Sequence, residues 1–440
     1  MNCKDENEML AILNEELIPA MGCTEPIALA YASAKGRCEL GGVPVSITAR
    51  CSGNMIKNVR CVSIPNSGGL VGIEAAVTLG AFGGSCGLGM EVLEAVTPTA
   101  LEQTRNFLEQ GGCKVDYLNS EIPLHFIINM TDGTDTVEIE VRHSHMNIVS
   151  VVKNGREIYS DVKSKEKAYA DRSGLNIENI KAFADEVDIE KIKPLFDRQI
   201  RCNMDIAYEG MSGSYGLNIG KTIRASYAEG VVTRMKAYAA AASEARMSGC
   251  DMPVIINSGS GNQGIASSVP LIVYAREKDI PQEKLYRALA FSALLTIHQK
   301  DNIGKLSAFC GAVSASCAAC AAVTYIAGGT IGQIKATIDN TLANIPGILC
   351  DGAKISCAAK IATSIDAGMM AHFLAMNGKA YKAFTGLLKE DAEETISCVG
   401  YIGKVGMRET DREIVKQMLT EQEENAFYGD CIKEKTLSAK

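Results

Sequence analysis

The sequence predicts an α+β protein in which a mixed N-terminal lobe with antiparallel strands precedes a largely helical C-terminal lobe. Residues 43–65 and 114–160 contain runs rich in β-branched residues, and polar and apolar positions alternate in parts of the second stretch. From about residue 205 onward the pattern is almost wholly helical and is interrupted by glycine-rich stretches. A chain of 440 residues is long enough for more than one domain. We therefore expect a mixed domain over residues 1–200 and a helical domain over residues 201–440.

The first elements are two helices joined by a tight turn. Residues 8–20 place apolar side chains at helical spacing, and this pattern ends near Pro19. The run Gly22-Cys23-Thr24-Glu25-Pro26 has the composition of a turn. Residues 26–35 then predict a second helix with proline in its first turn, where the missing N–H group costs little.

Strands and one further helix follow in the N-terminal lobe. Two β-rich runs, residues 45–49 and 59–64, lie on either side of Ser52-Gly53-Asn54, and this pattern favours a hairpin. Residues 92–110 are helical in pattern. Strands return over residues 114–160, where Asp132-Gly133 separates two alternating runs, residues 124–128 and 136–141.

Composition argues against a nucleic-acid-binding protein. The formal net charge is −8 and the isoelectric point is about 5.4, whereas a phosphate backbone needs a basic surface. Aromatic residues make up 5% of the chain and tryptophan is absent, so platforms for base stacking are not expected. We expect a small-molecule substrate as the partner, and the sequence leaves self-association into a homo-oligomer open.

Compartment and membrane association follow from two local patterns. The chain begins with polar and acidic residues, unlike the basic and then apolar start of a secretory signal, so we expect a cytoplasmic and reducing environment. The sixteen cysteines are then free thiols, packing groups or metal ligands. Residues 306–333 carry no charge but are mainly Ala, Gly, Ser and Cys, which predicts a buried helix and no membrane span.

Two glycine-rich segments have a composition that is compatible with an anion site. Residues 211–222 resemble a nucleotide P-loop, but Tyr215 stands where that motif needs glycine, so ATP binding is not expected. Residues 257–264 follow an apolar run and open a helical segment, where backbone N–H groups can bind a carboxylate. A plain helix cap explains this second segment equally well. Our functional interpretation gives substrate contacts to Asn257, Ser258, Ser260 and Asn262, with Asn66 and Ser67 in a similar but weaker context.

Histidines offer little support for a zinc site. His143 and His145 alternate on a predicted strand and so share a face, but no cysteine or carboxylate pattern beside them completes a zinc site. His298 shortly precedes Cys310 and is interpreted as a polar neighbour of the cysteines.

Cysteine spacing leaves two candidate ligand sets open. Cys317 and Cys320 form a CxxC pair on one face of an Ala-rich helix, although no second CxxC completes a zinc ribbon. The two sets are Cys310 with Cys317 and Cys320, or Cys310 with Cys350 and Cys357. A loop-like run separates Cys350 from Cys357, and loops can point backbone N–H groups at the sulfurs of a cluster. This favours the second set without excluding the first.

Four features together resemble one enzyme family. They are Gly22-Cys23-Thr24-Glu25-Pro26, Asn257-Ser258-Gly259-Ser260-Gly261-Asn262, residues 303–311, and the steps of 40 (350 − 310) and 7 (357 − 350) residues between Cys310, Cys350 and Cys357. The chain thereby resembles, over nearly its whole length, the iron–sulfur L-cysteine desulfidases that do not use PLP. That family is related to the α domain of bacterial iron–sulfur L-serine dehydratases. The resemblance implies a [4Fe–4S] cluster held by Cys310, Cys350 and Cys357, with one iron open and Cys23 as catalytic base.

The implied reaction converts L-cysteine and water to pyruvate, ammonia and hydrogen sulfide. An open iron can act as a Lewis acid for the leaving sulfide, and a thiolate near a helix N-terminus can act as a base. Dehydration of L-serine uses the same chemistry, and the residues above do not distinguish the two substrates. A non-catalytic iron–sulfur sensor and a cluster-free structural protein are the alternatives from other classes.

Overall fold

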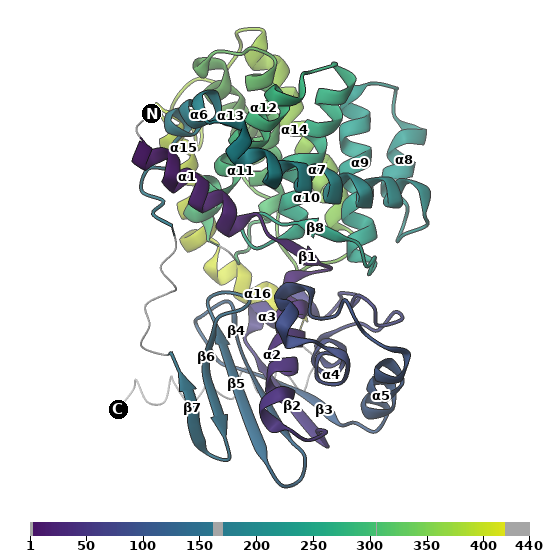
Figure 1. Ribbon diagram of the computed structural model, residues 1–440. Coiled ribbons are helices and arrows are strands. Elements are labelled where there is room, and N and C mark those ends of the chain that lie inside the picture. The colour runs from purple at the N-terminus through teal and green to yellow at the C-terminus, as the bar shows by residue number, and fades with distance from the viewer. Residues whose placement is uncertain (1–2, 162–169, 305, 419–440) are drawn as a thin grey trace, which may run out of the picture. The chain divides into compact units, whose positions relative to one another are not determined.

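The α+β prediction is confirmed by a computed structural model, which describes residues 3–161, 170–304 and 306–418 (Figure 1). The chain divides into two compact units. The helical unit comprises Met1–Ala20, Ala168–Cys350 and Lys354–Arg408, and the sheet unit comprises Met21–Lys167, Asp351–Ala353 and Glu409–Lys440, as far as these ranges are described. Lys305, within the segment 303–311 noted above, lies outside the described residues.

The helical unit is built around one buried helix. Its helices are α1 (Cys3–Glu16), α6 (Ile177–Glu186), α7 (Ile189–Ser212), α8 (Ile219–Ser226), α9 (Val231–Met247), α10 (Gly261–Glu277), α11 (Gln282–Ile303), α12 (Gly311–Ile326), α13 (Ile331–Asn344), α14 (Cys357–Met376), α15 (Ala392–Tyr401) and the short η2 (Ile402–Gly406). Helix α12 is buried along nearly its whole length and packs against α10, α11, α13 and α14 (Figure 1). Its small residues let these helices approach closely, so the charge-free segment forms the centre of this unit. A short pair of strands, β1 (Pro19–Met21) and β8 (Pro253–Ile255), leads into the loop before α10.

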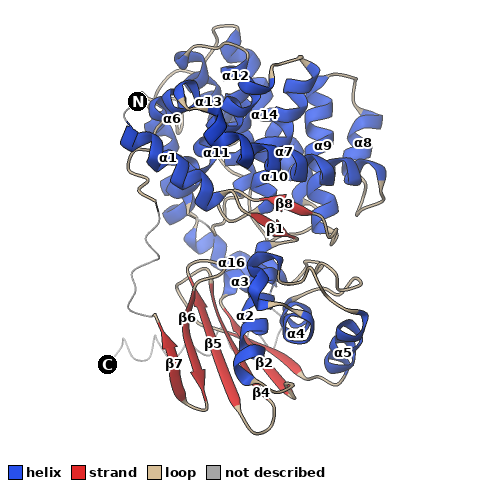
Figure 2. Cartoon of the chain, in the orientation of Figure 1, coloured by secondary structure: helices blue, strands red, loops and turns tan. Residues whose placement is uncertain are grey.

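The sheet unit contains a six-stranded mixed sheet with two helices on one face. The strands lie in the order β3-β2-β4-β5-β6-β7, and they are β2 (Ser46–Cys51), β3 (Cys113–Tyr117), β4 (His125–Thr131), β5 (Thr136–Arg142), β6 (Ile148–Lys153) and β7 (Arg156–Ser160). Strands β2 and β3 are parallel and the other neighbours are antiparallel. Helix α2 (Thr24–Leu40) runs across β4 and β5 and packs on α4 (Ile73–Gly83) (Figure 2). The remaining helices are α3 (Gly53–Val59), η1 (Cys86–Glu91), α5 (Pro98–Glu109) and α16 (Arg408–Met418).

The close packing of α2 on α4 depends on one glycine. A Cβ atom built on Gly80 would lie only 2.3 Å from the carbonyl oxygen of Ala30, so no larger residue fits at this crossing. Helix α2 is therefore held firmly on its inner face, and its first turn carries Cys23 and Glu25 into a fixed position within this unit.

The predicted hairpin around residues 52–54 is wrong. Strand β2 forms as expected, but the chain then turns into helix α3 instead of returning as a strand. Met55, Ile56 and Val59 are all buried, and their spacing places them on one face of that helix. Burial of this face outweighs the β propensity of residues 59–64, of which only Ser63 makes an isolated bridge.

The division into units differs from a single boundary at residue 200, which falls inside α7. The first 20 residues belong with the helical unit, where Arg172 forms ion pairs with Glu15, Glu16 and Asp301. Residues after 408 belong with the sheet unit, where the buried Lys57 pairs with Asp411. Each unit is therefore assembled from segments far apart in the chain.

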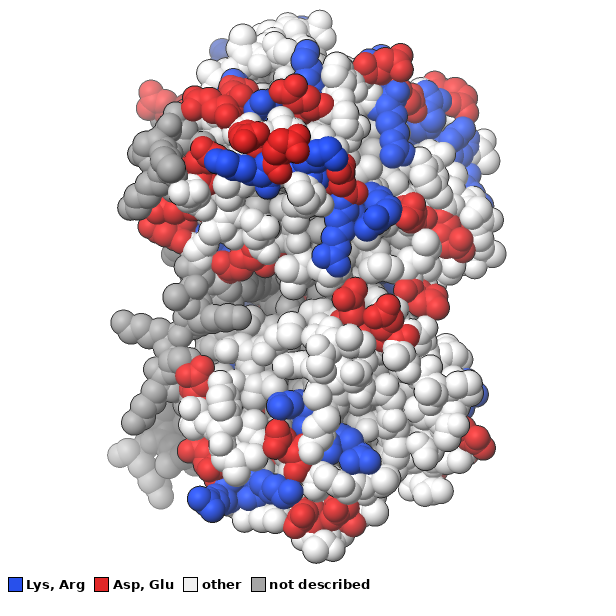
Figure 3. Space-filling view, viewed as in Figure 1, with Lys and Arg blue, Asp and Glu red and all other residues white. Residues whose placement is uncertain are grey.

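Surface charge is mixed on the face shown in Figure 3, where acidic and basic side chains are interspersed over both units. Within the ranges described, no helix is both long enough and apolar enough to cross a bilayer.

Candidate functional site

Three cysteines of the helical unit lie at or just before the starts of two helices. They are Cys310, Cys350 and Cys357, and they are called here the cysteine trio. Cys310 is the N-cap of α12 and Cys357 is the first residue of α14. A short antiparallel bridge joins Phe309 to Leu349, with the N–H of Cys310 donating to Ile348 O (2.8 Å) and the N–H of Cys350 donating to Ala308 O (2.7 Å). This bridge sets Cys310 beside Cys350.

The three thiols of the trio interact electrostatically. A hydrogen bond with Cys350 raises the pKa of Cys310 well above its ordinary value, and burial and the charges of Cys350 and Cys357 add to this effect. Burial raises the pKa of Cys357, with a further contribution from Cys350. The structure therefore brings together the three cysteines of the second candidate set.

A buried lysine accompanies the trio. Lys300, on α11, is only 3% exposed, and burial lowers its pKa while the nearby sulfurs of Cys310 and Cys350 oppose that shift. An ammonium group here would balance negative charge on thiolates. Sequence reasoning missed Lys300, and the available signal was a lysine in the last turn of a helix whose middle is apolar.

The residues of the trio fit an anionic iron–sulfur cluster. Two of the three sulfurs are at helix N-termini, where the helix dipole favours negative charge, and Lys300 adds a cation. In the part of the chain that the structure describes, no three His, Cys, Asp or Glu side chains are arranged to hold a single metal ion. A cluster makes a different demand, because each thiolate binds its own iron and the sulfurs need not meet at one point.

The CxxC pair, Cys317 and Cys320, is placed differently. Both residues are fully buried in the middle of α12, and burial raises the pKa of Cys317 to about 12. The thiol of Cys320 donates to Ile365 O (3.8 Å), and Gly368 of α14 packs directly on it. These two thiols fill space between helices.

The loop before α10 holds itself in shape through two of the predicted residues. Asn257 is fully buried, and its amide nitrogen donates to Ala293 O (3.2 Å) while its amide oxygen accepts from the Ser258 hydroxyl (2.8 Å). Ser258 and Gly259 have φ angles of 49° and 76°, so the loop turns sharply into the helix. Asn257 and Ser258 thus position the backbone of this loop.

The other two predicted loop residues lie at the start of α10. Ser260 is the N-cap and makes no side-chain capping bond. The amide oxygen of Asn262 accepts from Ser243 Oγ (3.0 Å) and from Arg246 Nη1 (3.1 Å). Arg246, at the end of α9, is 1% exposed and was missed by sequence reasoning because nothing in the sequence of α9 links it to a loop downstream.

The start of α10 lies close to the trio. A Cβ atom built on Gly311 would lie 2.4 Å from Cδ of Gln263, so the side chain of Gln263 rests against the residue that follows Cys310. The structure therefore brings the Asn257–Asn262 loop and the cysteine trio together within the helical unit.

Asn66 and Ser67 belong to the sheet unit, and their side chains serve their own loop. Asn66 Nδ2 donates to Leu93 O (2.9 Å), and the Ser67 hydroxyl, which is fully buried, donates to Ile64 O (2.7 Å). Asn66 also has a positive φ angle of 55°.

Cys23 lies in the sheet unit at the N-cap of α2 and is 3% exposed. Its thiol donates to Glu25 Oε2 (3.2 Å). The carboxylate of Glu25 also accepts from Thr24 Oγ1 (3.0 Å) and from Asn58 Nδ2 (3.2 Å). The sequence alone assigns no role to Glu25, whereas the structure shows its carboxylate accepting the hydrogen bond from the Cys23 thiol.

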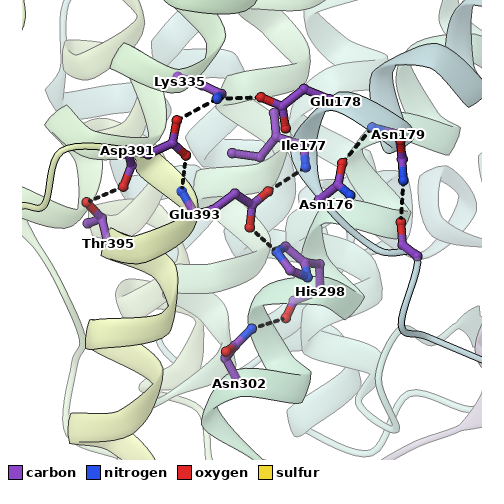
Figure 4. Close-up of polar contacts among 11 residues, drawn as sticks. Asn176, Ile177, Glu178, Asn179, His298, Asn302, Lys335, Asp391, Glu393 and Thr395 are labelled. Carbon is purple, nitrogen blue, oxygen red and sulfur yellow. Dashed lines mark hydrogen bonds and ion pairs between the residues drawn. The ribbon is translucent and has the colours of Figure 1, made fainter.

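His298 takes part in a polar network that joins four helices (Figure 4). Its Nε2 atom lies 2.6 Å from Glu393 Oε2, and the other oxygen of Glu393 accepts from the N–H of Ile177. Lys335 pairs with Asp391 and Glu178 in the same network. His298 therefore ties α11 to α15.

A pocket of about 390 Å³ lies elsewhere in the helical unit, along the outer face of α14, where Met369, Met370 and Phe373 line it together with Val232. None of the predicted site residues lines this pocket.

Comparison with known proteins gives a family for this arrangement. Residues 87–416 match the family described as serine dehydratase alpha chain. A UPF0597 protein of Lachnoclostridium phytofermentans is 45% identical over 413 residues, which cover 94% of this chain and 99% of that protein. UPF0597 proteins of Treponema denticola (44% over 416 residues, 93% and 96%) and Oleidesulfovibrio alaskensis (35% over 418 residues, 93% and 97%) are also similar. The chain belongs to the serine dehydratase alpha chain family, a family related to lyases.

Proposed function

We propose that this protein eliminates sulfide from L-cysteine to give pyruvate, ammonia and hydrogen sulfide, using a [4Fe–4S] cluster held by Cys310, Cys350 and Cys357. The observation that carries the proposal is the meeting of these three thiols at the starts of α12 and α14 beside Lys300. Membership of the serine dehydratase alpha chain family supports β-elimination from a small amino acid. Three protein ligands leave one iron of such a cluster open, and when bound the cluster supplies a Lewis acid that stabilises the leaving sulfide.

In this proposal Cys23 removes the Cα proton and Glu25 prepares it to do so. The thiol of Cys23 first gives its proton to the Glu25 carboxylate, to which it is hydrogen-bonded. The resulting thiolate, at the N-cap of α2, is favoured by the helix dipole. It then accepts the Cα proton, while the departing sulfide leaves from Cβ and takes up a proton as hydrogen sulfide. The aminoacrylate product tautomerises to an imine, which water hydrolyses to pyruvate and ammonia.

Substrate positioning is assigned to the loop before α10. We propose that Ser260, Asn262 and the backbone N–H groups at the start of α10 contact the amino acid, and that Asn257 and Ser258 hold the loop in shape. Asn66 and Ser67 are proposed to act in the same way from their own loop, through backbone groups that their side chains fix.

The second candidate function is dehydration of L-serine, and the name of the matched family favours it. A hydroxyl leaving group makes the same demands on an open iron and a base. A non-catalytic iron–sulfur sensor is the third candidate, and it predicts a cluster without turnover.

The decisive experiment is an anaerobic visible spectrum of the reconstituted full-length protein, followed by addition of L-cysteine or L-serine. We expect broad cluster absorbance that changes when L-cysteine is added, together with release of sulfide, ammonia and pyruvate. Ammonia and pyruvate from L-serine alone would assign the dehydratase function. A cluster that turns over neither amino acid would leave the sensor function, and protein that stays colourless and free of iron after reconstitution would exclude all three.

A further inference from the structure

Arg246 is buried in the helical unit with two donor groups unused. Its side chain is 1% exposed, and its Nη1 atom donates to Asn262 Oδ1 (3.1 Å). The Nε and Nη2 atoms are buried and have no hydrogen-bond partner among the residues that the structure describes. These two atoms form the side of the guanidinium group that binds a carboxylate through two parallel hydrogen bonds.

The guanidinium group of Arg246 packs against the first residue of α10. A Cβ atom built on Gly261 would lie 2.3 Å from Nε and 2.8 Å from Nη2, so a side chain here would displace the guanidinium group. The N-terminus of α10 carries partial positive charge, and so does the arginine. Two positive features placed together in a buried region call for an anion between or beside them.

A buried acceptor lies two residues further along the same helix. Gln263 is 6% exposed, and its Oε1 atom has no partner in the described part of the chain. Its side chain also rests against Gly311, next to Cys310 of the trio. An unused acceptor complements an ammonium group, as the unused donors of Arg246 complement a carboxylate.

We infer that Arg246 and Gln263 form the binding site for the two charged groups of an α-amino acid, with Arg246 taking the carboxylate and Gln263 the ammonium group. This inference rests on the proposed function only in choosing an amino acid as the ligand. It explains why Gly261 must lack a side chain and why a buried arginine keeps two donors that find no partner among the described residues.

A purely structural role for Arg246 is the competing explanation. Arg246 lies in the last turn of α9, where the helix dipole favours a cation, and its bond to Asn262 ties α9 to α10. That explanation uses only Nη1 and leaves Nε and Nη2 unsatisfied in the ligand-free and ligand-bound protein alike. The two explanations predict different effects of Arg246 substitutions on ligand binding and on the stabilisation that a ligand gives.

The binding test uses the reconstituted full-length protein and two probes that cannot eliminate a leaving group, L-alanine and L-alaninamide. Calorimetry should show that wild-type protein prefers L-alanine, because only L-alanine has a carboxylate. Arg246→Gln should weaken L-alanine binding at least about 30-fold and leave L-alaninamide binding unchanged, since two charge-assisted hydrogen bonds are lost. Arg246→Lys should give an intermediate loss, because it keeps the charge but not the paired donors. Arg201→Gln, at an exposed arginine of α7, is the matched control.

Equal L-alanine binding by wild type and Arg246→Gln, or a wild type that binds neither probe, would overturn the inference. Failure of the proposed function is a separate result: carboxylate-dependent binding through Arg246 without turnover of L-cysteine or L-serine would remove the activity and leave the site.

A second measurement covers the case in which Arg246→Gln does not fold. The melting temperature of ligand-free Arg246→Met should equal or exceed that of wild type, because the variant removes an unpaired buried charge. L-Alanine, and not L-alaninamide, should raise the melting temperature of wild type and of Arg246→Lys, and should leave Arg246→Met unchanged. An Arg246→Met variant that is strongly destabilised, with no selective effect of L-alanine on wild type, would assign Arg246 a structural role.

Discussion

The cysteine trio and the CxxC pair are two sets of thiols in one unit, and the structure treats them in opposite ways. Cys317 and Cys320 have the spacing of metal ligands but lie in the middle of α12, each surrounded by neighbouring helices. The trio has irregular spacing but gathers where α12 and α14 begin. Helix interiors have their backbone N–H groups occupied, whereas helix starts have N–H groups free to face an anion. Position on a helix therefore separates the two sets better than spacing does.

The largest expected effect is loss of the cluster and of activity, and it should follow the removal of a cysteine from the trio but not from the CxxC pair. Cys350→Ala should abolish both the visible absorbance and the activity of reconstituted protein, since two thiolates hold a cluster poorly. Cys317→Ala, the matched change in the CxxC pair, should keep iron content and turnover. Iron and sulfide analysis with a spectrum of both variants tests the contrast. Loss of iron in Cys317→Ala with retention in Cys350→Ala would reverse it.

A second prediction distinguishes the two roles proposed for a thiol at a helix start, which are a catalytic base and a cluster ligand. Cys23→Ser should retain the cluster spectrum and lose about 10²–10⁴-fold in turnover, the range that a general base contributes. Cys61→Ser changes an exposed thiol of the same unit and should retain activity. Full turnover by Cys23→Ser would remove the assignment of the base.

The packing role of the CxxC pair predicts a smaller effect, on stability alone. A Cβ atom on residue 368 would lie 2.7 Å from Cys320 Sγ, so Gly368→Ala should lower the free energy of unfolding by about 1–3 kcal/mol through overpacking. Cys320→Ala should remove the sulfur part of this clash and leave the contact with Cβ of residue 320 at 2.9 Å, so the double variant should be more stable than the sum of the single changes predicts. Urea unfolding of the four proteins measures this coupling. Strict additivity would show that the two residues do not pack together.

The smallest expected effect concerns the network around His298, which the structure uses to join helices. Burial would raise the pKa of Glu393, but the hydrogen bond and charge of His298 outweigh it and hold that pKa below its ordinary value. Glu393 then contributes stability above pH 4.5, its ordinary pKa, and loses it as the pH falls through the lowered value. Glu393→Gln should cost about 1 kcal/mol near pH 7 and little in acid, by unfolding at both pH values.

The neighbouring and exposed Glu394 gives the control for that experiment. Glu394→Gln should change stability little at either pH. A loss in Glu393→Gln that is the same at both pH values would mean that its charge does not matter.

Local periodicity was enough to predict the fold class, the buried helix over the charge-free segment and most strands of the sheet unit. It could not predict α3, because the burial of Met55, Ile56 and Val59 depends on partners elsewhere in the chain. It also could not show that residues 1–20 belong with helices that begin beyond residue 168, since this grouping depends on long-range packing.

The same limit applies to the candidate site. Composition and spacing identified the three cysteines and the loop at residues 257–262, but left the choice between two cysteine sets open. Lys300, Arg246 and Glu25 have roles that depend on what lies next to them: two sulfurs, a glycine backbone and a thiol. Such neighbours are defined in three dimensions, and a single sequence does not reveal them.

The hydrogen bond between Cys310 and Cys350 has a consequence for how the protein is assembled and handled. Without a cluster, dioxygen can oxidise these two neighbouring thiols to a disulfide, taking up their two electrons and two protons as hydrogen peroxide. A disulfide would occupy two of the three sulfurs that are proposed to bind iron. Air exposure before reconstitution should therefore block cluster insertion until a thiol reductant reopens the bond. If the trio binds iron as proposed, the contact between Cys310 and Cys350 sets the order of events, with reduction first and iron second.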